Sequence, residues 1–170
     1  MMRPRIEHGD MTQASDFDRA KRMGVIIVQN PSHFMIPQYM VPRLGADRLK
    51  RTTIVRSIVD AGVPFALGSD GPMNPFLNIM FATINANNPP QALTREQALI
   101  AYTSGSAAAE FAENEKGTLK KGMLADMALL SQDIFKVPPP ELPNRQRADD
   151  RQRPRRPRDP PVNRGPLALP

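Results

Sequence analysis

The chain has 170 residues, enough for one domain of ordinary size with one hydrophobic core. It contains no cysteine and only two histidines, His8 and His33. Disulfides, thiolate metal sites, cysteine nucleophiles and all-histidine metal sites are therefore excluded. No apolar run approaches the roughly 20 residues that a membrane helix needs, and no apolar segment follows the basic N-terminus as it would in a signal peptide. These features predict a soluble, cytoplasmic protein without a membrane partner.

The formal net charge of +6 is concentrated at one end of the chain. Residues 145–170 hold eight arginines and three aspartates, whereas residues 1–144 have a net charge of +1. The body of the chain therefore offers no electrostatic basis for binding nucleic acid.

Residues 138–170 hold ten of the nineteen prolines and no aromatic residue. Such a segment buries too little apolar surface to offset its ordering entropy, so we expect a disordered Pro/Arg-rich tail. It could be a polybasic arm that binds acidic partners, or a solvated segment with no specific role. The second interpretation is favoured because the tail lacks aromatic stacking residues and proline dilutes its arginines.

Helix-like and strand-like stretches alternate along the first half of the chain. A helix is expected over 16–23, with Gly24 placed to end it. The β-branched run 25–29 is typical of a strand covered on both faces, as in a parallel sheet. The pattern then repeats, with a helix over 46–60, a strand over 63–68 and a helix over 74–84. This order predicts βα units.

The pattern changes from Thr94 onward. The sequence Thr-Arg-Glu-Gln at 94–97 is a capping box that begins a helix through Tyr102. A second helix is expected over 106–113. Two short strands are expected at 117–119 and 126–130, as parts of a small β-structure.

Three polar clusters follow predicted strands. They are Arg-Ile-Glu-His at 5–8, Gln-Asn-Pro-Ser-His at 29–33 and Gly-Ser-Asp-Gly-Pro at 68–72. In a (β/α) barrel the carboxyl ends of the strands converge on one mouth, so these residues can share a site. Imidazole and carboxylate groups are ligands of hydrolytic divalent metals, which lower the pKa of a bound water.

Each candidate also has an ordinary structural interpretation. His8 near a chain start is more often a surface histidine than a ligand. His33 follows a turn sequence and could stabilise its loop, and Asp70 between Ser and Gly could form an Asx-turn. No serine lies in a Gly-x-Ser-x-Gly elbow and no P-loop lysine is present, so serine-hydrolase and phosphate-loop chemistry have little support.

The ordered combination resembles the amidohydrolase superfamily, and within it the amidohydrolase 3 branch of YtcJ-like proteins. The three clusters match that family's last three barrel strand ends. Two later motifs add to the likeness, Leu-Thr-x-x-Gln-Ala-Leu at 93–99 and Gly-x-Leu-x-x-Gly-x-x-Ala-Asp at 117–126. The resemblance spans about residues 3–143.

The resemblance implies an α/β fold made of the C-terminal three βα units of a TIM-barrel hydrolase and part of a small β-sandwich. The expected divisions are 1–113 for the partial barrel with its following helices, 114–137 for the β-sandwich segment and 138–170 for the tail.

It also implies a function, the hydrolysis of non-peptide carbon–nitrogen bonds in small amides or cyclic amides by metal-activated water. His8 would be a metal ligand, Asp70 both a ligand and the catalytic base, and His33 a substrate contact. The implied cofactor is a divalent metal, with zinc the expected ion.

Other ligands of the family are not found in this sequence, which has no His-x-His motif. We therefore expect a fragment that is inactive alone and binds metal poorly, since catalytic zinc generally has three protein ligands. Three βα units cannot close an eight-stranded barrel, so association with a complementary fragment or a second copy is expected. The alternative function is a non-catalytic interaction protein whose basic tail binds acidic partners.

Overall fold

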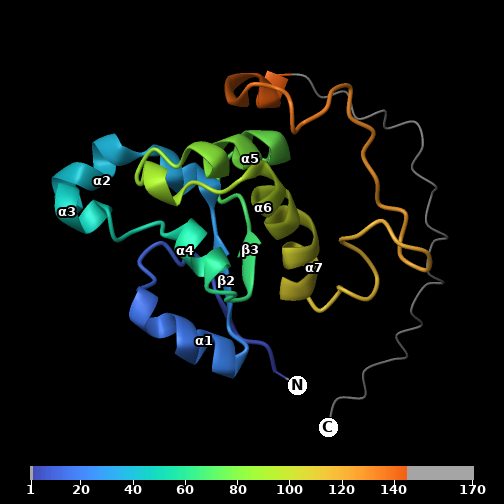
Figure 1. Cartoon of the computed structure of the whole chain (residues 1–170), viewed down its shortest axis with the longest axis horizontal. Coiled ribbons are helices and arrows are strands. Elements are labelled where there is room, and N and C mark those ends of the chain that lie inside the picture. The colour runs from blue at the N-terminus through green and yellow to red at the C-terminus, as the bar shows by residue number, and fades with distance from the viewer. Residues whose placement is uncertain (1, 145–170) are drawn as a thin grey trace, which may run out of the picture.

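A computed structural model describes residues 2–144 as an α/β fold around a small parallel sheet. The strands are Arg5–Ile6 (β1), Ile26–Gln29 (β2) and Phe65–Leu67 (β3), in the order β1-β2-β3 (Figure 1). Both neighbouring pairs are parallel. All four residues of β2 are buried, which confirms the covered strand predicted at this position.

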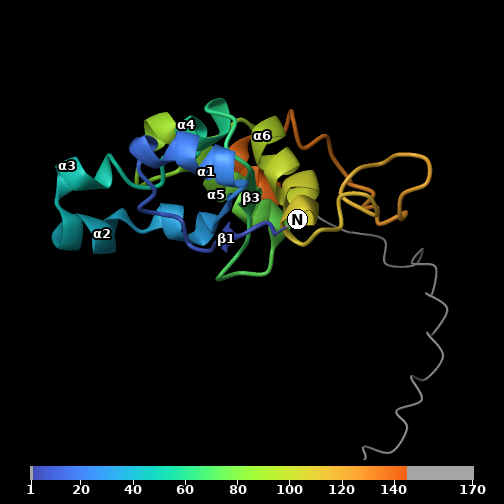
Figure 2. The same cartoon turned by 90° about the horizontal axis from the view of Figure 1, so that it is seen from below.

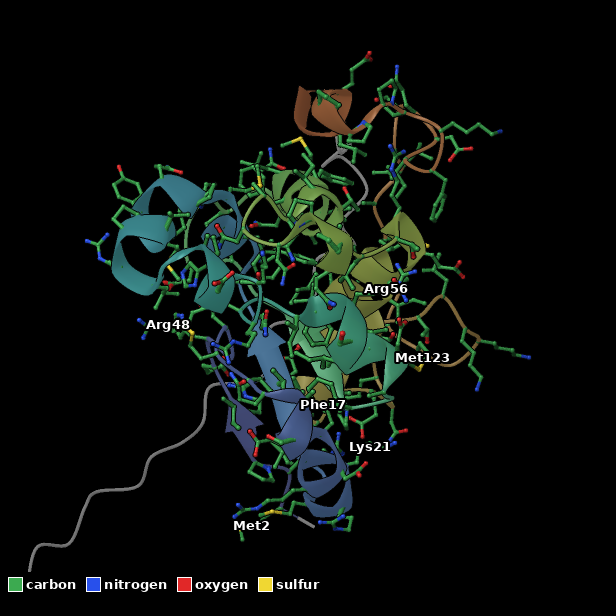
Figure 3. All side chains as sticks on the ribbon, turned by 60° about the vertical axis from the view of Figure 1, so that its left-hand side comes forward. Met2, Phe17, Lys21, Arg48, Arg56 and Met123 are labelled. Carbon is green, nitrogen blue, oxygen red and sulfur yellow. The ribbon has the colours of Figure 1, made fainter. Side chains whose placement is uncertain are left out.

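Side chains of β2 alternate between two apolar layers, as the period of a strand requires. Ile27 packs with Phe17 of helix α1 (Phe17–Met23) and Ile58 of helix α4 (Val55–Asp60). Ile26 and Val28 pack on the other side against α7 (Ser106–Ala109) through Ala109. In Figure 3, Phe17 lies between α1 and the sheet, whereas Met2, which is 92% exposed, lies at the margin.

Helix α1 ends where the sequence predicted. Gly24 follows its last residue with φ 63°, and its backbone N–H donates to the carbonyls of Ala20 and Lys21. Glycine adopts the left-handed conformation at little energetic cost, so the chain can turn directly from α1 into β2.

The prediction of a single helix over 46–60 is wrong. The structure has two short helices, α3 (Ala46–Leu49) and α4. Between them Thr53 has φ 47°, and its backbone carbonyl accepts a hydrogen bond from Asn85 Nδ2 at 2.9 Å. In a continuous helix this carbonyl would accept a hydrogen bond from a backbone N–H within the helix. Here the buried side-chain amide of Asn85 donates to it instead. In two perpendicular views α3 and the preceding α2 (Pro37–Leu44) project from one end of the molecule (Figures 1 and 2).

The helices after β3 largely follow the sequence. Helix α5 (Pro75–Ile84) begins at Asn74, whose side chain accepts from the N–H groups of Phe76 and Leu77. Helix α6 (Arg95–Ile100) has the predicted capping box, with both reciprocal bonds between Thr94 and Gln97.

A π-helical turn, Ala101–Gly105, joins α6 to α7. A Cβ on Gly105 would lie 2.5 Å from the carbonyl oxygen of Phe65, so only glycine allows this helix to approach β3 so closely. Because α7 ends at Ala109, it is shorter than the helix predicted over 106–113.

The strands predicted at 117–119 and 126–130 are wrong, because the structure has no strand anywhere between residues 110 and 144. Leu119 and Leu129 are 77% and 80% exposed, so neither side chain is covered by an apolar layer as in a β-sandwich. They loop out at the end opposite α2 and α3 (Figures 1 and 2). The β-sandwich assignment of 114–137 stays a prediction.

The tail predicted to be disordered from 138 begins instead with an ordered turn. Residues Pro139–Asn144 form a 3-10 helix that packs against α5, and Leu142 is buried in the main apolar cluster. Residues 145–170, with the basic arm, lie outside the described part of the chain. Within the described part, no helix is long and apolar enough to cross a membrane.

Candidate metal centre

Three side chains meet where the parallel strands end. His8 follows β1, His33 lies in the 3-10 turn Pro31–Met35 after β2, and Asp70 follows β3. Because the carboxyl ends of parallel strands share one edge of a sheet, residues far apart in sequence become neighbours. The structure thus brings together all three residues singled out in the sequence.

Their ligand atoms lie close to one another. Asp70 Oδ2 is 3.3 Å from His8 Nδ1 and 3.2 Å from His33 Nε2. The two imidazole rings are stacked with centroids 5.3 Å apart and an interplanar angle of 19°. One ligand atom from each residue falls within 4.8 Å of the others. The cluster thus offers two nitrogens and a carboxylate oxygen, a donor set that suits zinc and similar divalent ions.

The backbone holds two of these residues in a costly conformation. His8 has φ 54° and Asp70 has φ 40°, in the left-handed region that non-glycine residues seldom adopt. Between His8 and Asp10, a Cβ on Gly9 would lie 2.6 Å from Ile27 Cγ2. The Asp70 loop is tied to the turn after β2 because the Ser32 hydroxyl donates to the carbonyl of Ser69 at 2.6 Å. Such strain persists only where the surrounding structure enforces it, and it is typical of functional sites.

Asp10 is a site residue that the sequence reasoning missed. Its Oδ2 lies 2.9 Å from His33 Nδ1, and its side chain is only 19% exposed. Burial raises the pKa of the Asp10 carboxyl above its ordinary value, and the hydrogen bond with His33 opposes that rise. In the sequence, Asp10 could have been suspected as a site residue from its position two residues after His8.

Asn30 and Gln29, both in the second polar cluster, also touch the site. Asn30 Nδ2 lies 3.2 Å from His8 Nδ1, and Gln29 Nε2 donates to the carbonyl of Gly9 at 2.7 Å. Glu7 is not brought in, since its carboxylate pairs with Arg5 at 3.0 Å on the surface.

A buried polar layer supports the site from behind. Asn87 Nδ2 donates to the carbonyl of His33 at 2.7 Å, and the backbone N–H of Thr53 donates to the carbonyl of Asp10 at 2.8 Å. Thr53 is in turn held by Asn85 through two side-chain hydrogen bonds. The segment that interrupts the predicted helix therefore positions Asp10.

Comparisons with known proteins show the family of the chain. The sequence profile of the amidohydrolase family matches residues 1–154. The chain belongs to the amidohydrolase family. This amidohydrolase chain is 29% identical over 152 residues to the putative amidohydrolase YtcJ of Bacillus subtilis, covering 81% of the chain and 28% of the relative. It is also 26% identical over 140 residues to the N-substituted formamide deformylase of Arthrobacter pascens, covering 76% of the chain and 26% of that enzyme.

Among solved structures, the amidohydrolase chain resembles an uncharacterized metal-dependent hydrolase from Pyrococcus furiosus. The TM-score is 0.72 at 27% identity, covering 79% of this chain and 29% of the other. The amidohydrolase chain thus spans less than a third of the length of these relatives. Family membership is confirmed, whereas the individual roles of His8, His33 and Asp70 remain predictions.

Proposed function

We propose that the chain carries part of the active centre of a metal-dependent hydrolase that splits non-peptide carbon–nitrogen bonds in small amides. The observation that carries the proposal is the contact between His8 and Asp70, which brings an imidazole and a carboxylate from different strands within 3.3 Å. Family membership and the named activity of the formamide deformylase support a substrate of the amide, cyclic amide or formamide class.

His8 and Asp70 would hold the metal, with zinc the expected ion. When bound, a divalent metal lowers the pKa of a coordinated water and polarises a carbonyl. Asp70 accepts the proton of the attacking water as general base, since its carboxylate is 55% exposed and reachable from solvent. The water oxygen bonds to the carbonyl carbon, the carbon–nitrogen bond breaks, and the same proton passes to the nitrogen, which becomes an amine.

The isolated chain is expected not to turn over substrate. The side chains of His8 and Asp70 are 50% and 55% exposed, so the cluster lies at an open surface. In such a place water screens the charges that stabilise a transition state in an enclosed site.

The expected inactivity is tested by assaying the purified chain, with added zinc, for hydrolysis of N-substituted formamides and cyclic amides. Turnover that Asp70→Asn abolishes would contradict it. The function itself is tested by replacing the matched segment of the Arthrobacter deformylase with the matched residues of this chain.

The folded chimera should hydrolyse N-substituted formamides and lose this activity with Asp70→Asn. Asp47→Asn is the matched control, because that carboxylate is 96% exposed on α3. A folded, metal-loaded chimera without turnover would refute the proposed function.

A further inference from the structure

The loop 69–72, which carries Asp70, cannot be closed by the backbone hydrogen bond of a β-turn. That bond joins the carbonyl of the first residue to the N–H of the fourth. The fourth residue of this loop is Pro72, which has no N–H. Because Asp70 adopts φ 40°, its conformation has to be held by other groups.

Side chains close the loop instead. The Ser69 hydroxyl donates to the carbonyl of Pro72 at 2.7 Å, which joins the two ends of the loop. Asn78, on helix α5, donates through Nδ2 to the same carbonyl at 2.9 Å, and its Nδ2 lies 3.5 Å from Ser69 Oγ. Since Ser69 and Pro72 flank Asp70, Asn78 contacts the loop on both sides of that residue.

Asn78 also ties the loop to the start of α5. Its Nδ2 lies 3.0 Å from the carbonyl of Asn74, the residue that precedes the helix. The two N–H bonds of this amide thus point to the carbonyls of Pro72 and Asn74. One side chain therefore connects the end of the loop to a helix that begins two residues later.

Packing alone does not account for an asparagine at position 78. The residue is 0% exposed and lies within a helix, where asparagine has a lower propensity than leucine. Its Oδ1 is buried without a hydrogen-bond partner in the described part of the chain, which is unfavourable. The amide is explained by its N–H groups, which reach the loop. Such departures from local preference are expected near functional sites.

Ser32 holds the loop from the opposite direction. Its hydroxyl donates to the carbonyl of Ser69 at 2.6 Å, and a Cβ on Gly71 would lie 3.0 Å from Ser32 Cβ. Ser32 thus fixes the backbone before Asp70 and Asn78 the backbone after it. Loss of either contact would free one side of the loop.

We propose that Asn78 is a positioning residue that fixes the loop 69–72 from α5 and thereby sets the direction of the Asp70 carboxylate. The inference rests on the proposed function, in which Asp70 is the general base. A general base has to lie within hydrogen-bond reach of the water that it deprotonates. A displacement of about 1 Å can lower turnover by about 100-fold, so the position of the loop matters for the reaction.

Asn78→Leu separates positioning from packing. It keeps a side chain of similar size and removes the N–H groups. Neither carbonyl loses its last donor, because Pro72 keeps the Ser69 hydroxyl and Asn74 keeps the backbone N–H of residue 78. The variant should therefore fold.

Asn88→Leu is the matched control. Asn88 is 5% exposed, and its Nδ2 also donates to two backbone carbonyls, those of Lys50 and Thr52. The control loses hydrogen bonds of the same kind, but in the segment between α3 and α4 rather than in the Asp70 loop.

Nitrogen-15 relaxation of the full chain gives a measurement that needs no activity. In the native chain the amides of Asp70 and Gly71 should have order parameters of about 0.85, typical of rigid backbone, and in Asn78→Leu they should fall below about 0.6. Asn88→Leu should leave both amides unchanged. Circular dichroism checks that the variants fold. Flexible amides in the native chain, or unchanged order parameters in folded Asn78→Leu, would overturn the proposal.

The deformylase chimera gives the second measurement. Asn78→Leu should lower kcat per folded, metal-loaded molecule by about 10- to 100-fold and leave KM nearly unchanged, because the base moves while the substrate contacts remain. Asn88→Leu should retain the kcat of the chimera. A role in folding alone would reduce only the amount of folded protein, and an unchanged kcat would contradict positioning.

The two hypotheses fail in different ways. If the chimera turns over and keeps its kcat in Asn78→Leu, only the positioning role is wrong. If the folded, metal-loaded chimera with Asn78 has no turnover, the proposed function is wrong, and the order parameters of Asp70 and Gly71 still decide whether Asn78 fixes the loop.

Discussion

Asn85 should be among the most sensitive positions in the chain, although it contacts neither histidine. It is fully buried, adopts φ 43°, and holds Thr53 through two side-chain hydrogen bonds of 2.9 and 3.1 Å. In Asn85→Ala the carbonyl and hydroxyl of Thr53 would lose these partners, at about 1–2 kcal/mol each. Alanine in a left-handed conformation adds about 1 kcal/mol. We expect the free energy of unfolding to fall by about 3–5 kcal/mol.

The two contributions can be separated with Asn85→Gly, which removes the same hydrogen bonds but tolerates the backbone. It should be more stable than Asn85→Ala by about 1 kcal/mol. Urea unfolding followed by circular dichroism measures both variants. The reasoning is refuted if Asn85→Ala costs less than about 1 kcal/mol, since water would then replace the buried amide.

Three further changes test the fold around the site. Thr94→Ala removes the capping box of α6 and should lower the free energy of unfolding by about 1 kcal/mol, measured by urea unfolding. No change would mean that tertiary contacts alone determine where this helix begins. Gly105→Ala puts a Cβ 2.5 Å from the carbonyl oxygen of Phe65, which should lower the free energy of unfolding by roughly 1–3 kcal/mol and the midpoint of thermal unfolding by several degrees. An unchanged midpoint would contradict the close approach of the helix to β3. Arg3 holds the pKa of the Glu113 carboxyl below its ordinary value, so the stability from this pair is present above the unfolded pKa and is lost as pH falls through the lowered one. Glu113→Gln should therefore flatten the acid side of the stability profile, and an unaltered profile between pH 7 and about pH 3 would refute that contribution.

Local sequence determined the elements whose signals are short in range. The β-branched run became β2, Gly24 ended α1, and the reciprocal bonds of Thr94 and Gln97 began α6. Each depends on neighbours a few residues apart, so no distant partner is needed to specify it. The placing of His8, His33 and Asp70 at one edge was also predictable, since each follows a strand of the same parallel sheet.

Tertiary contacts decided what depends on residues far apart along the chain. Asn85 interrupts the helix predicted over 46–60, and Leu119 and Leu129 in the segments predicted as strands are exposed to solvent. The pairing of Asp10 with His33 joins residues 23 positions apart, and no local pattern specifies it. Sequence thus determined the ligand types and their common edge. Only the packed structure, by aligning three strand ends and burying Asp10, decided which nitrogen of His33 faces Asp70.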